Sequence, residues 1–144
     1  MDNAISPNIT LFVDWNGTLE ADEALMSKLG EFQNNKVDVY VCTSMNMSNN
    51  IFQEWFAVNG FAFDPAKNYV NGRDKPSKEF WENLMTEKNI DKNKALVIDD
   101  KLSICKAAEA AGITAVEWKG VGKPLASNMD DLHAAMTTIG YKPL

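Results

Sequence analysis

The sequence predicts an α/β fold, a doubly wound and mainly parallel sheet with helices on both of its faces. Short runs of continuous apolar and β-branched residues, typical of parallel strands buried on both faces, occur at 9–13, 37–42, 95–98 and 113–118. Segments with apolar residues at helical spacing lie between these runs. Because strands and helices alternate along the chain, we expect a single domain over residues 1–144.

Capping residues predict where the helices begin and end. Helices are expected in the segments 21–34, 48–59 and 102–111. Ser48, Ser77 and Ser127 are the expected N-caps of the second, third and last helices, because a serine hydroxyl can accept a hydrogen bond from the free N–H groups of a first turn. Gly112 is expected at the C′ position that ends the helix 102–111, where a left-handed conformation favours glycine.

The composition is that of a globular protein. Hydrophobic residues make up 45% and charged residues 24% of the 144 positions, so the chain can bury a core without a metal or disulfide. The net charge of −6 provides no basic footprint, and non-specific nucleic-acid binding is therefore not expected. Cys42 and Cys105 have no neighbouring Cys or His with which to build a zinc site, and we expect reduced, buried thiols.

The sequence shows no membrane or export signal. No segment approaches the roughly 18 consecutive apolar residues of a membrane span. The N-terminal residues lack the basic and apolar regions of a signal peptide. We therefore expect a cytoplasmic protein that does not insert into membranes.

Polar side chains follow the predicted strands at the points where the strands end. Asp14 follows the first strand, Thr43-Ser44 end the second, and Asp99-Asp100 follow the strand at 95–98. Lys75 precedes the helix that begins near Ser77. In doubly wound sheets, ligands bind beyond the carboxyl ends of the strands, so these residues are expected to converge at one edge of the sheet.

Each of these residues also has an ordinary structural interpretation. Asp14 and Asn16 suit a turn after a strand, in which Asp, Asn and Gly are common. Asp99-Asp100 suit an N-cap pair before the helix that starts at Leu102. The order of the elements along the chain argues against these interpretations taken alone.

Four short motifs resemble those of the haloacid dehalogenase-like (HAD) superfamily, and together they span nearly the whole chain. They are Asp14-Trp15-Asn16-Gly17-Thr18-Leu19, Thr43-Ser44, Lys75-Pro76 and Asp99-Asp100, the last followed by Ala107-Ala108-Glu109-Ala110-Ala111-Gly112-Ile113. The corresponding motifs of the superfamily are Asp-x-Asp-Gly-Thr-Leu, a Ser or Thr, a Lys, and an acidic pair. The resemblance implies a Rossmann-like core without a cap domain, and a phosphatase or phosphotransferase.

The resemblance implies a role for each motif residue. Asp14 would be the nucleophile that forms an aspartyl-phosphate. Thr43 or Ser44 would hydrogen-bond the transferring group, and the alternation of side chains along a strand leaves only one of them facing the site, with Thr43 at the family position. Lys75, with Lys78 as the competing candidate, would balance negative charge.

The resemblance also implies a magnesium ion. Its ligands would be oxygen atoms of Asp14, of the backbone carbonyl of Asn16 and of Asp100, with Asp99 acting through water or from outside the ligand set. The phosphoryl group of the substrate would bind against this cation, because the carboxylate nucleophile would otherwise repel it.

Asn16 departs from the superfamily pattern. Phosphatases of the superfamily usually have Asp at this position, where it protonates the leaving group and activates water, and an amide does neither. Losing a general acid-base costs ~10²–10⁴ in rate. The sequence therefore predicts a weak phosphohydrolase or phosphotransferase, with a catalytically inactive binding or regulatory module that retains the metal site as the alternative.

The spacing of the motifs leaves no room for a cap. The interval from Asp14 to Thr43 is used by one helix, and the interval from Thr43 to Lys75 by another helix and the segment 61–70. Capless members of the superfamily act on macromolecules or rely on a partner subunit to close the site, so the resemblance implies a phosphorylated substrate that could be a macromolecule. A receiver domain is excluded by order, since its acidic pair precedes its Thr/Ser and Lys.

Overall fold

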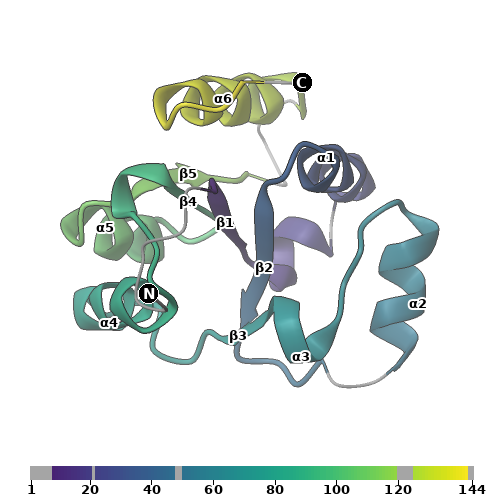
Figure 1. Ribbon diagram of the computed structural model, residues 1–144, viewed down its shortest axis with the longest axis horizontal. Coiled ribbons are helices and arrows are strands. Elements are labelled where there is room, and N and C mark those ends of the chain that lie inside the picture. The colour runs from purple at the N-terminus through teal and green to yellow at the C-terminus, as the bar shows by residue number, and fades with distance from the viewer. Residues whose placement is uncertain (1–7, 21, 48–49, 120–124, 143–144) are drawn as a thin grey trace.

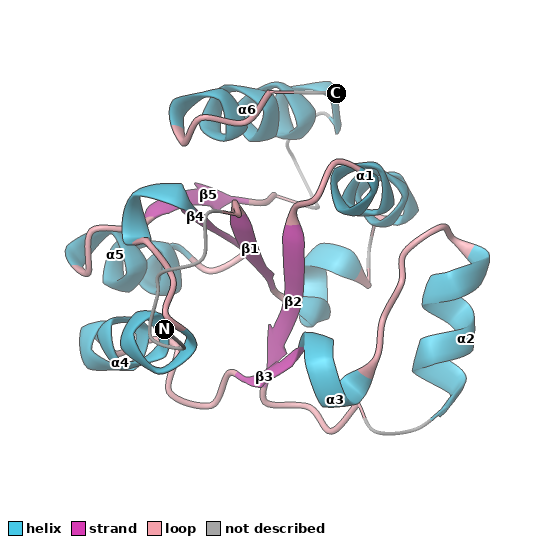
Figure 2. Cartoon of the chain, in the orientation of Figure 1, coloured by secondary structure: helices cyan, strands magenta, loops and turns pink. Residues whose placement is uncertain are grey.

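The five strands of the computed structural model form one parallel sheet. The structure describes residues 8–20, 22–47, 50–119 and 125–142. In this part of the chain the strands follow the order β3-β2-β1-β4-β5 across the sheet. Their bounds are β1 (Thr10–Val13), β2 (Asp38–Thr43), β3 (Tyr69–Asn71), β4 (Ala95–Asp99) and β5 (Thr114–Glu117). The predicted α/β class with a parallel sheet is confirmed (Figure 2).

Helices cover both faces of the sheet. They are α1 (Glu23–Asn34), α2 (Asn50–Val58), α3 (Pro65–Asn68), α4 (Lys78–Lys88), α5 (Leu102–Ala110) and α6 (Leu125–Thr138). Two short turns, η1 (Trp15–Leu19) and η2 (Lys92–Lys94), complete the described elements. Figure 1 shows α1 and α6 on one side of the sheet and α4 and α5 on the other. The fold is therefore doubly wound, as predicted.

The alternation of side chains along the strands builds two hydrophobic cores. In β1, Leu11 and Val13 enter the core beneath α1 and α6, whereas Phe12 enters the core beneath α4 and α5. β4 divides in the same way, with Leu96 and Ile98 on the first side. Strands buried on both faces read as continuous apolar runs in the sequence, which explains why they were predictable.

The helix ends agree only partly with the capping predictions. Gly112 has φ +87° and directly follows the C-cap residue of α5, so the C′ prediction is confirmed. Ser77 is the N-cap residue of α4, but its hydroxyl donates to Glu79 rather than capping a backbone N–H. The prediction for Ser127 is wrong because α6 begins at Leu125, and a serine is tolerated inside a helix. Ser48 lies outside the described residues.

The element order bears on the N-cap interpretation of Asp99-Asp100 and on the room for a cap between Asp14 and Lys75. The N-cap residue of α5 is Lys101, so Asp99-Asp100 do not form an N-cap pair. Within the described residues, the chain between Asp14 and Lys75 contains only η1, α1, β2, α2, α3 and β3.

None of the described helices is long and apolar enough to cross a membrane.

The register of the strands sets the edge at which the polar residues meet. Val13 pairs with Val41 of β2 and with Ile98 of β4. β1, β2 and β4 therefore end at nearly the same level, and the residues at their carboxyl ends are neighbours.

Candidate active site

Asp14 lies at the carboxyl end of the central strand, where the chain turns into η1. Its backbone N–H donates to the carbonyl of Ile98 (2.9 Å), which continues the pairing of β1 with β4 by one residue. Its carbonyl accepts from Leu19 N (3.2 Å), and its Oδ2 accepts from the hydroxyl of Thr18 (3.3 Å). The residue is only 7% exposed. Both its backbone and its carboxylate are therefore held in place.

An aromatic cluster anchors the turn after Asp14. The ring of Trp15 makes edge-to-face contacts with Phe52, Trp55 and Phe56 of α2, at centroid distances of 5.6, 5.3 and 5.5 Å. Trp15 is 5% exposed and Phe56 is fully buried. Edge-to-face pairs are the favoured geometry of aromatic rings, so α2 fixes the backbone beside Asp14.

Lys75 links the first and fourth strands through its ammonium group. Its Nζ donates to Asp14 Oδ1 (2.8 Å), to Asp99 Oδ2 (2.7 Å) and to the carbonyl of Cys42 (2.9 Å). These three acceptors use all three of its donors. Lys78 instead lies half-exposed near Glu82, 3.9 Å away. The structure thus brings Lys75, and not Lys78, to Asp14.

Two residues that the sequence interpretation missed position Lys75. A Cβ on Gly72 would lie 2.9 Å from Cε of Lys75 and 3.0 Å from the backbone N of Thr43, so only glycine fits beside the lysine. The indole N–H of Trp81 donates to the carbonyl of Lys75 (2.8 Å). The proximity of Gly72 to Lys75 in the sequence was an available signal for the role of Gly72, whereas nothing in the sequence indicates the role of Trp81.

Asp99 and Asp100 follow one another at the end of β4 but have different surroundings. Asp99 is 1% exposed, and its Oδ1 accepts from Lys101 N (3.0 Å) while its Oδ2 accepts from Lys75. Within the described residues, Oδ1 of Asp100 is buried and has no hydrogen-bond partner. Burying a carboxylate oxygen without a partner costs free energy, and this cost favours the binding of a cation there.

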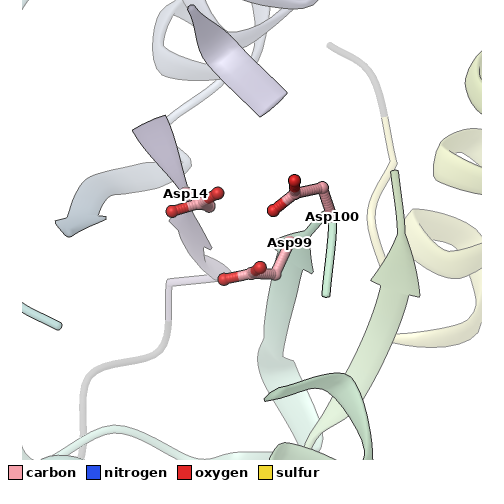
Figure 3. Close-up of side chains that lie close together, drawn as sticks. All are labelled: Asp14, Asp99 and Asp100. Atoms are coloured by element: carbon pink, nitrogen blue, oxygen red, sulfur yellow. The ribbon is translucent and has the colours of Figure 1, made fainter. Parts of the chain in front are cut away.

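Three carboxylates share one small space. One oxygen from each of Asp14, Asp99 and Asp100 lies within 4.8 Å of the other two. Figure 3 shows Asp14 and Asp100 facing each other, with Asp99 beside them. Gly17, with φ +76°, makes this arrangement possible, because a Cβ there would collide with Oδ2 of Asp100.

Burial and mutual repulsion perturb the acidic groups. Burial raises the pKa of Asp14 to about 6; Lys75 opposes this shift and Asp99 adds to it. Burial also raises the pKa of Asp99, again against the effect of Lys75. For Lys75, burial acts to lower the pKa, but the two carboxylates outweigh burial and raise it. One ammonium group therefore does not neutralise the site, and a further cation is favoured there.

The donor atoms fit a hard divalent cation. The clustered ligand atoms are all carboxylate oxygens. Burial raises the pKa of both Cys42 and Cys105 to about 12, and neither thiol belongs to the cluster. Oxygen donors without thiolate or imidazole are characteristic of Mg²⁺ and Ca²⁺ sites.

The remaining motif residues line a cleft of about 160 Å³ beside Asp14. Thr43 is buried, and its Oγ1 accepts from Met45 N (3.2 Å); Ser44 and Asn16 are exposed. Both Thr43 and Ser44 line the cleft, so the alternation argument does not separate them: β2 ends at Thr43, and Ser44 lies beyond the strand. A larger hollow of about 590 Å³ beside Met85 is lined by none of the candidate site residues.

Comparisons with solved structures identify the fold. An uncharacterised protein from Corynebacterium glutamicum has a TM-score of 0.60 and 12% identity, over 90% of this chain and 95% of that one. A candidate HAD-like phosphatase from Mesorhizobium loti has a TM-score of 0.59 and 17% identity, over 98% of this chain and 92% of that one.

The chain has a HAD-like fold. A third structure, of a HAD family enzyme from Bacteroides thetaiotaomicron in complex with magnesium and inorganic phosphate, has 25% identity and a TM-score of 0.47, over 72% of this chain and 53% of that one. No protein-family model and no curated protein matches the chain. In the HAD-like fold of this chain, the cluster of Asp14, Lys75 and Asp100 lies at the carboxyl edge of the sheet.

Proposed function

We propose that this protein is a magnesium-dependent phosphohydrolase or phosphotransferase that acts through Asp14. The observation that carries the proposal is the carboxylate of Asp14, held by Lys75 at 2.8 Å beside the unpartnered oxygen of Asp100. The HAD-like fold and the phosphatase-like neighbour from Mesorhizobium loti support the same reaction class.

The magnesium ion would be held by Asp14, Asp100 and the backbone carbonyl of Asn16. Asp99 would act from outside this set, because it is the most deeply buried of the three carboxylates and is held by Lys75 and by the backbone N of Lys101. When bound, the ion neutralises charge on the carboxylates and on the phosphoryl oxygens.

The chain's own residues perform the transfer. An oxygen of Asp14 forms a bond to phosphorus while the bond from phosphorus to the leaving oxygen breaks, which gives an aspartyl-phosphate. Lys75 keeps the carboxylate ionised and oriented, and Thr43 or Ser44 donates a hydrogen bond to the phosphoryl group. Water then attacks the phosphorus and releases phosphate.

Asn16 limits both steps, because its amide neither protonates the leaving oxygen nor deprotonates the water. We therefore expect slow turnover, fastest with leaving groups that need no proton, such as a carboxylate or a phenolate. The same residue favours the second candidate function, a binding or regulatory module that retains the metal site without turnover. The absence of a cap between Asp14 and Lys75 in the described residues allows a phosphorylated macromolecule as substrate.

Turnover of 4-nitrophenyl phosphate and of acetyl phosphate, with magnesium or with EDTA, tests the proposal. We expect slow magnesium-dependent hydrolysis by wild type, an increase of roughly 10²-fold or more for Asn16→Asp, and loss of activity for Asp14→Asn. Lys75→Met should also abolish turnover, whereas the matched variant Lys78→Met should not. Activity that survives Asp14→Asn would rule out the mechanism. The protein is a binding module instead if wild type has no turnover and Asn16→Asp does, while magnesium raises the melting temperature of both proteins.

A further inference from the structure

The cleft at Asp14 is smaller than an ordinary ligand site. Its volume is about 160 Å³, whereas pockets that enclose a whole small-molecule ligand measure about 300–1,000 Å³. A phosphoryl group fits between Asp14, Thr43 and Lys75, but the rest of a substrate must lie over the rim. The residues at the rim therefore decide which phosphorylated compounds bind.

Two exposed cations lie at this rim. Arg73 and Lys101 both line the cleft, one from the loop before Lys75 and the other from the loop between β4 and α5. Arg73 is the only arginine in a chain of net charge −6. The cations thus gather at the rim although the protein as a whole is acidic.

The charged groups of these two residues have no partner within the described part of the chain. The backbone N of Arg73 donates to Asn71 Oδ1 and the backbone N of Lys101 donates to Asp99 Oδ1, so each loop is held by its main chain. Neither side chain forms an ion pair with a described residue, in contrast to Lys75, Lys28 and Lys78. The guanidinium and the ammonium group remain available to a ligand.

We propose that Arg73 and Lys101 bind a second anionic group of the substrate, so that this protein acts on phosphorylated compounds that carry a further carboxylate or phosphate. This inference rests on the proposed function and adds the class of substrate. The transferring phosphoryl group already has Lys75, Thr43 or Ser44 and the magnesium ion, whereas Arg73 and Lys101 are the two further cations among the described residues that line the cleft. A guanidinium matches the planar geometry of a carboxylate or the oxygens of a phosphate.

The test compares substrates with and without the second anion. Values of kcat/KM are measured with magnesium for phenyl phosphate, for 4-carboxyphenyl phosphate and for a phenylene bisphosphate, whose phenolate leaving groups are of similar basicity. The last two substrates separate a carboxylate from a phosphate as the second group. We expect wild type to prefer at least one doubly anionic substrate. Arg73→Met/Lys101→Met should lower kcat/KM for that substrate about tenfold and leave kcat/KM for phenyl phosphate within about twofold. In the variant Arg73→Lys, kcat/KM for that substrate should lie between the values for wild type and for the double variant.

The matched control is Lys106→Met, which removes an exposed cation of α5 that does not line the cleft. It should leave kcat/KM unchanged for all three substrates. Equal losses for all three substrates in the double variant, or no preference in wild type, would overturn the inference while the proposed function stands. If wild type has no turnover at all, calorimetry with magnesium and two phosphonates still decides. Tighter binding of phosphonoacetate than of methylphosphonate, lost in Arg73→Met/Lys101→Met, supports the second-anion site, and equal binding of the two phosphonates contradicts it.

Discussion

At the scale of single residues, the site holds more negative charge than the fold alone favours. Asp14 and Asp99 are almost fully buried, yet Lys75 is the one ammonium group of the described residues that bonds to both of them. The pKa of Asp14 is consequently raised to about 6, mainly by burial. Residues that bind an ion or a substrate are often held in such unfavourable surroundings, which the ligand then relieves.

The raised pKa of Asp14 predicts how the stability of the metal-free protein depends on pH. Because the folded pKa of about 6 exceeds the ordinary value of 3.8, the folded state binds more protons between these values. The free energy of unfolding should therefore fall as pH rises from 4 to 6 and stay low above it. Asp14→Asn, whose amide oxygen can still accept the bond from Lys75, should be about 1–3 kcal/mol more stable than wild type at pH 7.5.

Urea unfolding in EDTA at pH 4.5 and pH 7.5 measures this effect. Asp130→Asn, which removes an exposed carboxylate of α6, is the control with the same change in charge and should be nearly neutral at both pH values. An Asp14→Asn protein that is less stable than wild type at pH 7.5 would contradict the prediction.

Gly17 offers a second test at the residue scale. It adopts φ +76°, and a Cβ there would collide with Oδ2 of Asp100. Gly60 adopts a similar φ of +86° but has nothing within 4 Å of the corresponding Cβ position. Gly60→Ala should therefore cost only the left-handed strain of about 1–2 kcal/mol. Gly17→Ala should cost more and should also weaken magnesium binding, because Asp100 must move away from Asp14.

Thermal unfolding with and without magnesium separates these two effects. Wild type and Gly60→Ala should gain the same increase in melting temperature from the ion, since ligand binding stabilises only the folded state. Gly17→Ala should lose most of that increase. The same response to magnesium in both variants would show that the contact of Gly17 with Asp100 is irrelevant to the metal.

At the scale of elements, α2 supports the turn after Asp14 through its aromatic face. Phe56 is fully buried and contacts Trp15, Phe61 and Phe63, whereas Val58 on the same helix is 85% exposed. Phe56→Ala should lower the free energy of unfolding by about 3–5 kcal/mol and should weaken turnover through movement of the turn after Asp14. Val58→Ala should change stability by less than about 0.5 kcal/mol. Urea unfolding and tryptophan fluorescence provide the measurement; a Phe56→Ala protein as active as wild type would show that α2 only stabilises the fold.

The elements themselves were largely predictable, and the exceptions have physical reasons. The runs at 9–13 and 95–98 correspond to β1 and β4 because strands buried on both faces carry uninterrupted apolar sequence. Cap residues were less reliable, since Ser127 lies inside α6 and Ser77 bonds a side chain instead of the backbone. A serine has several possible partners, and its local sequence does not say which one it takes.

At the scale of the whole molecule, the sequence predicted which residues meet but not how they are held. The convergence of Asp14, Thr43 and Asp99 follows from parallel strands that end at one edge. The roles of Gly72 and Trp81 in positioning Lys75 depend on packing between segments that the sequence does not place relative to each other. The charges at the rim, Arg73 and Lys101, were unpredictable for the same reason, since neither belongs to a motif.

The strand order also has a consequence for the folding pathway. Lys75 contacts Asp14 across 61 sequence positions and Asp99 across 24, and β4 pairs with β1 although β2 and β3 lie between them in the sequence. Contacts between such distant segments require the closure of large loops and slow the folding reaction. Asp14 and Asp99 therefore come together only through the long-range pairing of β1 with β4. The cleft is lined by residues at the ends of β1, β2 and β4, so we expect ligand binding and the native pairing of β4 to be lost together when the protein unfolds.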